Sequence, residues 1–332
     1  MSHIKNIEIK NFKSIRHAKI EDCRRVNVFI GYPNVGKSNI LEAMSLFHCS
    51  KSSRKVNLKD FVRFEDAAEL FFEGNARENA IISYNDEKSL YLKYNGTSSV
   101  SITPENYDES RNYVTFEREN IGVGFSELFN FYKYHFDSKL IGTEGSTSLQ
   151  YLSAPFGENL YYIVREYEEI RKEFNELLKP FGLKILMDKI TNSLKLIKTV
   201  DEDSIFTLSF SLLADTLQRV IFYKSAIETN SNSVLLFEEP EAHMFPPFIA
   251  RFTTEIMYDK NNNQYFIATH SPFVLNDFME DMDNSELSIY AVGYVKGETT
   301  IIRLTDKQVN DIYQYGVDLF FNLEDFLKDV VA

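Results

Sequence analysis

Short apolar runs separated by polar turns recur along the chain and predict a protein with both strands and helices. Two runs, residues 233–239 and 264–270, are almost wholly apolar, which is typical of buried parallel strands. Residues 69–102 contain shorter runs separated by Gly and Asn turns, which predict antiparallel hairpins. Strands are expected at residues 4–10, 26–31, 69–74, 80–85, 88–95, 99–103, 183–187, 194–199, 205–210, 233–239, 264–270, 287–294 and 299–304.

Apolar residues that recur at three- and four-residue steps predict the helices. The strongest such pattern covers residues 158–179, and Pro180 and Gly182 should end that helix. Residues 103–150 are polar and irregular and predict no regular element. Further helices are expected at residues 37–47, 215–227, 247–258 and 309–332.

The composition is that of an ordinary globular protein with a large core. The chain has 332 residues, of which 44% are hydrophobic, so one large domain or two ordinary ones are expected. Its two cysteines, Cys23 and Cys49, are too few for a disulfide framework. The N-terminus has no apolar segment, and no run approaches the ~18 residues of a membrane helix. We therefore expect a cytoplasmic protein without a membrane segment.

Charge is distributed unevenly along the chain. The formal net charge is −13, yet residues 1–60 hold 12 Lys and Arg against 5 Asp and Glu. An acidic surface with a basic edge is the ordinary explanation, and a positive patch that faces a polyanion is the alternative. The overall acidity argues against broad nonspecific DNA binding, although a local DNA contact stays open.

A phosphate-binding loop follows the strand expected at residues 26–31. Gly31, Gly36, Lys37 and Ser38 match the pattern Gly-x-x-x-x-Gly-Lys-Ser in full. In such a loop the backbone N–H groups and the following helix N-terminus bind phosphates, the Lys neutralises their charge, and the Ser binds Mg²⁺. The residues expected to contact ATP are Gly31, Asn34, Val35, Gly36, Lys37, Ser38 and Asn39.

Candidate catalytic residues follow the two most apolar runs. Glu238 and Glu239 end the first run, where one carboxylate can hold Mg²⁺, through water, and the next can act as a general base. His270 ends the second run, from which it can reach the γ-phosphate or the attacking water. Taken alone, the two acids could be surface charge and the histidine an ordinary polar residue. Together with the phosphate loop, they predict an ATPase site with ATP and Mg²⁺ as cofactors.

These blocks resemble the ABC-type ATPase heads of the SMC/RecF/OLD superfamily, which are often called AAA family ATPases. The likeness rests on "IEIKNFKSIRHAKIED", "GYPNVGKSNILEAM", "LLFEEPEAHMFPP" and "FIATHSPFVLN". It implies an α/β P-loop NTPase fold with a central, mostly parallel sheet, an antiparallel β lobe and a small helical insertion. Residues 1–332 would form a single head, in which residues 51–200 are inserted between an N-terminal half (1–50) and a C-terminal half (201–332).

The resemblance also implies that the site is completed by a second subunit. The signature segment of these ATPases aligns with residues 209–219, so that Ser211 would contact the γ-phosphate bound by a partner subunit. Ala214 and Thr216 stand where relatives carry glycines, which favours slow hydrolysis or an altered dimer geometry. Gln150 is the candidate for the glutamine that contacts the metal, and Phe245 replaces a second histidine of the family.

The resemblance favours an ATP-hydrolysing switch protein that works as an ATP-dependent homodimer or higher oligomer. Stand-alone heads of this kind resemble the ATPase subunits of bacterial anti-phage defence systems, which control a separately encoded nuclease or toxin. A RecF-like DNA-repair ATPase is the alternative, supported by the basic segment 1–60. A transporter's nucleotide-binding subunit fits less well, because Glu238 stands where the Asp of an Asp-Glu pair is expected.

Overall fold

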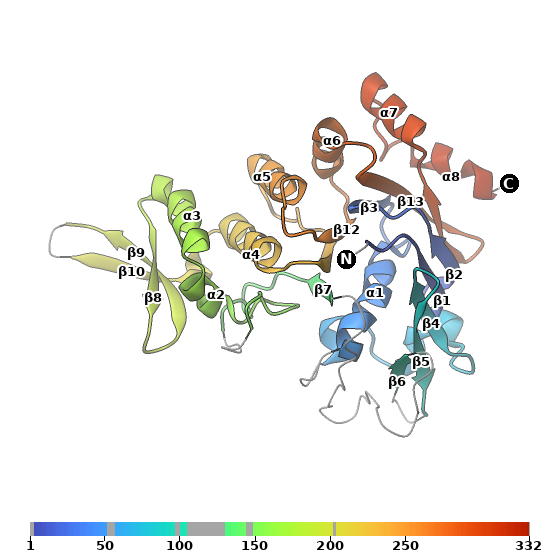
Figure 1. Ribbon diagram of the computed structural model, residues 1–332, viewed down its shortest axis with the longest axis horizontal. Coiled ribbons are helices and arrows are strands. Elements are labelled where there is room, and N and C mark those ends of the chain that lie inside the picture. The colour runs from blue at the N-terminus through green and yellow to red at the C-terminus, as the bar shows by residue number, and fades with distance from the viewer. Residues whose placement is uncertain are drawn as a thin grey trace. The chain divides into compact units, whose positions relative to one another are not determined.

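The computed structural model describes residues 3–51, 57–96, 100–104, 130–143, 149–201 and 204–331, and the chain forms two compact units (Figure 1). The first unit comprises residues 1–133, 232–239 and 262–332, and the second comprises residues 134–231 and 240–261. The boundaries expected at residues 50 and 200 stay a prediction.

A six-stranded sheet forms the centre of the fold, and its strands lie in the order β14-β13-β3-β12-β11-β7. Neighbouring strands from β13 to β11 run parallel, and β14 is antiparallel to β13. All six residues of β3 are buried, as expected for a strand with parallel neighbours on both sides. The strands are β14 (Glu298–Arg303), β13 (Leu287–Val295), β3 (Val26–Gly31), β12 (Gln264–Ala268), β11 (Ser233–Glu238) and β7 (Asn130–Tyr134).

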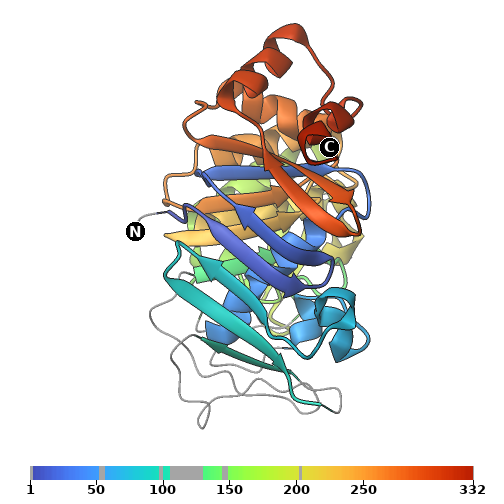
Figure 2. The ribbon, with the colours of Figure 1, turned by 90° about the vertical axis from the view of Figure 1, so that its right-hand side faces the viewer.

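A five-stranded antiparallel sheet accompanies the central sheet in the first unit. Its order is β2-β1-β4-β5-β6, so the two N-terminal strands join the hairpins expected between residues 69 and 102 (Figure 2). Helix α1 (Lys37–Lys51) packs against strands of both sheets. The strands are β1 (Ile7–Phe12), β2 (Ile15–Ile20), β4 (Ala80–Tyr84), β5 (Lys88–Tyr94) and β6 (Val100–Pro104).

Three further helices belong to the first unit. Helix α6 (Pro272–Asp281) begins with a proline at its first turn, a position that needs no N–H donor. Helix α7 (Asp306–Tyr315) begins with a capping box between Thr305 and Gln308. Gly316 ends α7 in the left-handed conformation, so the helix expected at residues 309–332 is divided into α7 and α8 (Leu323–Val331).

The second unit combines helices with a small sheet. Its helices are α2 (Leu160–Glu166), α3 (Glu168–Leu178), α4 (Asp215–Thr229) and α5 (Pro246–Met257). The antiparallel sheet has the order β10-β9-β8, with strands β8 (Lys184–Asp188), β9 (Ser193–Thr199) and β10 (Ile205–Ser209). Helix α4 packs on α5, and α3 packs on β8.

The helix expected over residues 158–179 is interrupted at Tyr167. That residue has an extended backbone (φ −99°, ψ 96°), which separates α2 from α3. The guanidinium of Arg171 donates to the carbonyls of Val164 and Arg165, both at 3.2 Å. These bonds supply partners to carbonyls at the end of α2, so the break leaves few backbone groups unsatisfied.

The prediction of a strand at residues 69–74 is wrong. Residues Ala67–Leu70 and Phe72–Gly74 form two short 3₁₀ helices instead. The Asp66 side chain accepts from the N–H of Ala68, and Glu69 completes a capping box. These local side-chain bonds favour a helical turn over the extended strand that the apolar residues suggest.

Among the described strands and α-helices, three are not predicted from the sequence. Strand β2 and helix α6 are absent from the expected elements, and β7 lies in the stretch 103–150 that was expected to be irregular. Residues 105–129 and 144–148 of that stretch lie outside the described residues.

Aromatic side chains fill much of the core beside the central sheet. Phe29 of β3 stacks on Tyr290 of β13, with ring centroids 5.2 Å apart. Cys23 and Cys49 are buried and unpaired with each other, and burial raises the pKa of the Cys23 thiol to about 12. Among the described residues, no helix combines the length and apolar character needed to cross a membrane.

Candidate nucleotide-binding site

The phosphate loop joins β3 to α1, and its backbone requires glycine. Gly36 has a φ of +103°, and a Cβ built there would lie 2.2 Å from Oγ1 of Thr299. A Cβ at Gly31 would lie 2.4 Å from the carbonyl oxygen of Val292. Asn34 also has a positive φ, of 64°. This close, partly left-handed chain turns backbone N–H groups inward, as a loop that binds phosphate needs.

Side chains from β14, from the turn between β1 and β2 and from α1 support the loop. Thr299 of β14 donates to the carbonyl of Val35 at 2.9 Å, and its hydroxyl lies 2.7 Å from that of Ser14. Asn39, expected to contact ATP, donates through Nδ2 to Ser14 Oγ at 2.6 Å. Asn39 therefore supports the loop from the first turn of α1.

Lys37 lies over the loop and is only 5% exposed. Its ammonium donates to the carbonyls of Gly31 and Tyr32, both at 2.9 Å. These bonds aim the charge at the space that the loop encloses. Phosphate oxygens of a bound nucleotide could replace these carbonyls as acceptors.

Glu238, the last residue of β11, is surrounded by cationic and hydroxyl donors. Oε1 accepts from Arg63 Nη2 at 2.9 Å, and Oε2 lies 3.2 Å from Lys133 Nζ. Burial would raise the pKa of Glu238, but Lys133, a hydrogen bond from Ser38 and Arg63 outweigh it and lower that pKa to about 2. Glu238 is therefore ionised at neutral pH, which is the form that can hold a metal ion.

A second carboxylate continues this network into α1. Glu42 is fully buried and accepts from Arg63 Nε at 2.8 Å. Its other oxygen accepts from Lys13 at 2.5 Å. Burial alone would lower the pKa of Arg63, but Glu238 and Glu42 outweigh it and raise that pKa. The guanidinium thus bridges one buried carboxylate and the candidate metal-binding carboxylate.

Glu239 and His270 face each other across the ends of β11 and β12. Oε1 of Glu239 lies 3.4 Å from Nε2 of His270. Glu239 has a φ of 43°, which is strained for a residue with a side chain, and its N–H donates to the carbonyl of Ala268 at 2.8 Å. Burial and the charge of Lys37 outweigh Glu239 and lower the pKa of His270, which favours a neutral imidazole at neutral pH.

The sheet order explains why these residues meet. Strand β12, which precedes His270, lies between β3 and β11. The three strands are parallel, so the loop after β3, Glu238 and Glu239 after β11, and His270 after β12 stand at one edge of the sheet. This juxtaposition agrees with the sequence prediction, while the role of each residue stays a prediction.

The other two predicted contacts, Ser211 and Gln150, belong to the second unit. Ser211 is exposed in a short 3₁₀ turn just before α4, and its Oγ donates to Ser209 Oγ at 3.3 Å. Gln218 of α4 holds this turn by donating to the carbonyls of Ser211 and Leu213. The carbonyl of Gln150 accepts a hydrogen bond from the Tyr167 hydroxyl. Their contacts with nucleotide or metal remain predictions.

The sequence does not predict Arg63 and Lys133, the two cations that contact Glu238. Neither lies in a recognised motif, and Arg63 meets Glu238 from 175 residues away. Lys133 carried a weak signal, because it is the lone charge among the aromatic residues of β7. A charged side chain at a buried strand position needs a partner of opposite charge.

The donor set fits a magnesium nucleotide. Among the described residues, no group of three or more His, Cys, Asp or Glu side chains could hold a metal by itself. Ser38 and Glu238 offer a hydroxyl and a carboxylate, and Mg²⁺ commonly uses one or two such ligands, phosphate oxygens and water. The loop, Lys37 and the N-terminus of α1 suit the phosphates of the nucleotide.

Fold and site together define the class as a P-loop ATPase head, and comparison with known proteins agrees. The family described as "AAA ATPase domain" matches residues 3–216. The chain therefore belongs to the AAA ATPase domain family. ATP hydrolysis is the activity of this family.

Two known proteins match parts of the chain. An uncharacterized protein of Methanocaldococcus jannaschii is 30% identical over 150 residues, which cover 44% of this chain and 64% of that protein. The DNA replication and repair protein RecF of Listeria monocytogenes is 26% identical over 191 residues, which cover 57% of this chain and 47% of that protein. The chain thus spans less than two thirds of the length of either relative.

Solved structures show the same fold at low sequence identity. An Smc head domain with an extended coiled coil, bound to the C-terminal domain of ScpA and derived from Pyrococcus furiosus, has a TM-score of 0.59 at 12% identity, covering 96% of this chain and 100% of that one. An Smc head bound to the C-winged helix domain of ScpA has a TM-score of 0.59 at 16% identity, and the match covers 94% of this chain and 100% of that one. At such identities the likeness concerns the fold alone.

Proposed function

We propose that the protein is an ATP-driven switch in which nucleotide binding joins two heads and hydrolysis separates them. One observation carries the proposal: parallel strands β3, β12 and β11 bring the phosphate loop, His270 and the Glu238–Glu239 pair to one edge of the sheet. A loop that binds phosphate, a metal-binding carboxylate and a second carboxylate are the parts that ATP hydrolysis needs.

The binding half of the mechanism uses residues of the loop and of β11. Lys37 exchanges its bonds to Gly31 and Tyr32 for bonds to phosphate oxygens, and the loop N–H groups complete the grip. Ser38 and Glu238 would hold Mg²⁺ on the nucleotide. When bound, Mg²⁺ supplies charge neutralisation on the phosphates.

The chemical half uses Glu239 and His270. Glu239 is about half exposed and lies beside Glu238, so its carboxylate can accept a proton from a water that attacks the γ-phosphate. His270 lies 3.4 Å from Glu239 and near Lys37, where its neutral ring can orient that water or contact the γ-phosphate. The left-handed backbone of Glu239 fixes where its carboxylate projects.

A second head completes the site through Ser211. This serine is exposed in the turn that leads into α4, a helix of 15 residues. A hydroxyl and a helix N-terminus can both stabilise negative charge on the γ-phosphate. Because Ala214 and Thr216 stand where relatives carry glycine, close approach is harder, and we expect slow turnover.

Mixing two inactive variants tests whether the site is shared between subunits. Lys37→Ala and Ser211→Ala should each lose most ATPase activity, because each dimer then has two defective sites. A 1:1 mixture should recover about a quarter of wild-type activity, since half of the dimers are mixed and hold one intact site. Steady-state phosphate release is the measurement.

The control mixes each variant with itself at the same total concentration, which should recover nothing. Size-exclusion chromatography with light scattering should show dimers in the presence of ATP and Mg²⁺. A mixture no more active than its components would contradict the placement of Ser211 across the dimer.

The finer biological role that we propose is the control of a separately encoded effector, a nuclease or toxin, in anti-phage defence. Its support is the resemblance to stand-alone heads of that kind. The Smc heads of similar fold were solved in complex with domains of another protein, ScpA, which supports the idea of a head that works through a partner. Co-purification with the product of a neighbouring gene, dependent on ATP, is the test.

A RecF-like DNA function is the second candidate, and the match to RecF over 57% of the chain favours it. The basic excess of residues 1–60 would supply contacts to phosphate. If this function is right, duplex DNA should bind in the presence of ATP, and each neutralised phosphate should steepen the loss of affinity with salt. Fluorescence anisotropy between 50 and 200 mM salt, with Lys37→Ala as control, distinguishes the two candidates.

A further inference from the structure

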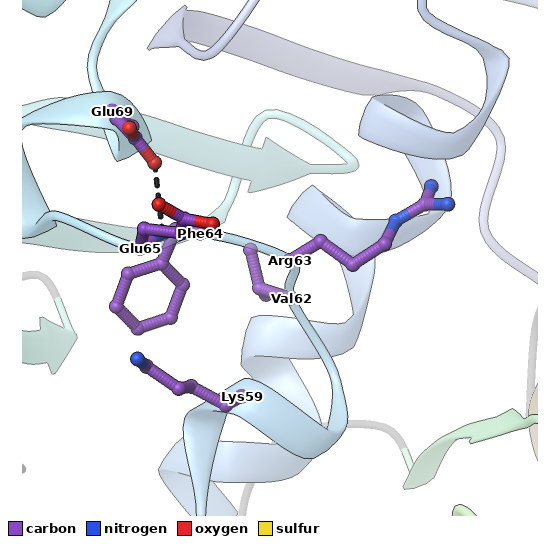
Figure 3. A pocket seen from close by; sticks show the side chains of 6 residues that line it. All are labelled: Lys59, Val62, Arg63, Phe64, Glu65 and Glu69. Atoms are coloured by element: carbon purple, nitrogen blue, oxygen red, sulfur yellow. Dashed lines mark hydrogen bonds between the residues drawn. The ribbon is translucent and has the colours of Figure 1, made fainter.

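The segment that follows α1 carries Arg63 toward the candidate metal site. Arg63 is one of the residues that line a shallow cavity of about 550 Å³, but its guanidinium points away from the other lining side chains (Figure 3). On its far side the guanidinium contacts Glu238 and Glu42 at 2.9 and 2.8 Å. Arg63 therefore joins a surface segment to the carboxylate at the end of β11.

Among the residues that the structure describes, the cations of this network outnumber its carboxylates. The carboxylates are Glu42 and Glu238, and the cations that contact them are Lys13, Arg63 and Lys133. Donors already occupy both oxygens of Glu238, and Ser38 adds a hydrogen bond. A metal ion that arrives without a counter-charge would meet an excess of positive charge there.

The two cations on Glu238 differ in their freedom to leave. Lys133 is 5% exposed and also donates to the carbonyl of Phe61 at 3.0 Å, so it is held in place. The side chain of Arg63 is 66% exposed, so its Nη2 can turn from Glu238 toward water while its Nε keeps the bond to the buried Glu42. Arg63 is thus the exchangeable partner of Glu238, and Lys133 is the permanent one.

We propose that Arg63 is an exchangeable counter-ion that competes with Mg²⁺ for Glu238. When Mg²⁺ arrives bound to a nucleotide, the negative phosphates offset the positive charge of the network, and the ion displaces the guanidinium from Glu238. Free Mg²⁺ has no such counter-charge and does not displace it. The displacement releases Arg63 from β11, so that the conformation of residues 57–70 depends on Mg²⁺ and nucleotide together. The inference rests on the proposed ATP site.

A Mg²⁺ titration of nucleotide binding tests this. At a saturating concentration of a fluorescent ATP analogue, Arg63→Gln should lower the Mg²⁺ concentration at half-maximal binding by about three- to fivefold, as expected for loss of one partly exposed ion pair. Nucleotide affinity in EDTA should stay within about twofold of wild type. Arg63→Lys should give a midpoint between the two, because an ammonium cannot bridge both carboxylates as a guanidinium does.

Arg77→Gln is the matched control, since it removes one exposed arginine of the same unit. Its Mg²⁺ midpoint should equal that of wild type. Hydrogen exchange of residues 57–70 should change with Mg²⁺ and nucleotide together in wild type, and the Mg²⁺-dependent part should vanish in Arg63→Gln.

The outcomes separate the inference from the proposed function. If Arg63→Gln and Arg63→Lys bind nucleotide with the wild-type Mg²⁺ midpoint or a higher one, Arg63 is no competitor and the inference is wrong. If the wild-type protein binds no nucleotide and Lys37→Ala behaves identically, the proposed ATP site itself is wrong.

Discussion

Glu239→Gln should lower kcat for ATP hydrolysis by about 10²–10⁴-fold, the range expected for loss of a general base. The amide keeps the size of the side chain but cannot take a proton from water. Glu238, Lys37 and the loop remain, so ATP affinity should change by less than about threefold. Single-turnover hydrolysis and equilibrium binding of an ATP analogue measure the two effects separately.

The same variant should hold ATP long enough to accumulate the joined form of the two heads. Glu87→Gln is the matched control, because it removes an exposed carboxylate from the turn between β4 and β5. It should hydrolyse ATP at the wild-type rate. Turnover by Glu239→Gln within threefold of wild type would exclude Glu239 as the base.

Lys133→Met should destabilise the first unit by about 3 kcal/mol, because it leaves the poorly exposed Glu238 with one partner fewer. The loss should depend on pH in a defined direction. The pKa of Glu238 is about 2 in the folded protein and 4.5 as its ordinary value. Its ion pairs therefore stabilise the fold fully above pH 4.5, and that stability is lost as pH falls toward 2.

Without Lys133 the pKa of Glu238 rises, so acid unfolding should begin at a higher pH than in wild type. Differential scanning calorimetry, which can resolve transitions of two units, measures both effects. The double variant Lys133→Met/Glu238→Gln should regain much of the loss, since no charge is then left without its buried partner. A double variant as unstable as the sum of the single variants would show that the two side chains do not interact.

The parts of the fold that could be predicted are those in which one continuous segment has a clear apolar pattern. Residues 233–239 and 264–270 are apolar on both faces, and they form the buried strands β11 and β12. Strand β2 was missed because three of its six residues are exposed, which weakens the apolar signal. The order of the strands in the sheets could not be predicted, because no local sequence pattern specifies which distant segments pair with each other.

Local side-chain bonds explain another failure. Residues 69–74 have the composition of a strand, yet Asp66 and Glu69 cap a 3₁₀ turn. The break at Tyr167 has the same character, because Arg171 satisfies carbonyls at the end of α2. Such competition between side chain and backbone is decided by geometry that apolar periodicity does not encode.

The residues of the candidate site likewise fall into two groups, those that the sequence predicts and those that only the structure reveals. Lys37, Ser38 and the pair Glu238–Glu239 follow fixed spacings from a strand end, so the sequence alone indicates them. Arg63 and Lys133 reach Glu238 only because the chain folds, and neither has a fixed spacing from it. Ion pairs between distant residues are set by tertiary structure and need coordinates to be seen.

The left-handed backbone at Glu239 bears on how this site can change over time. A side chain in that conformation costs about 1 kcal/mol or more relative to glycine. Glycine would therefore make the strand end more stable and would remove the carboxylate in the same step. Under selection for stability alone, glycine should replace Glu239, and a lineage that keeps an acid there does so for activity rather than for folding.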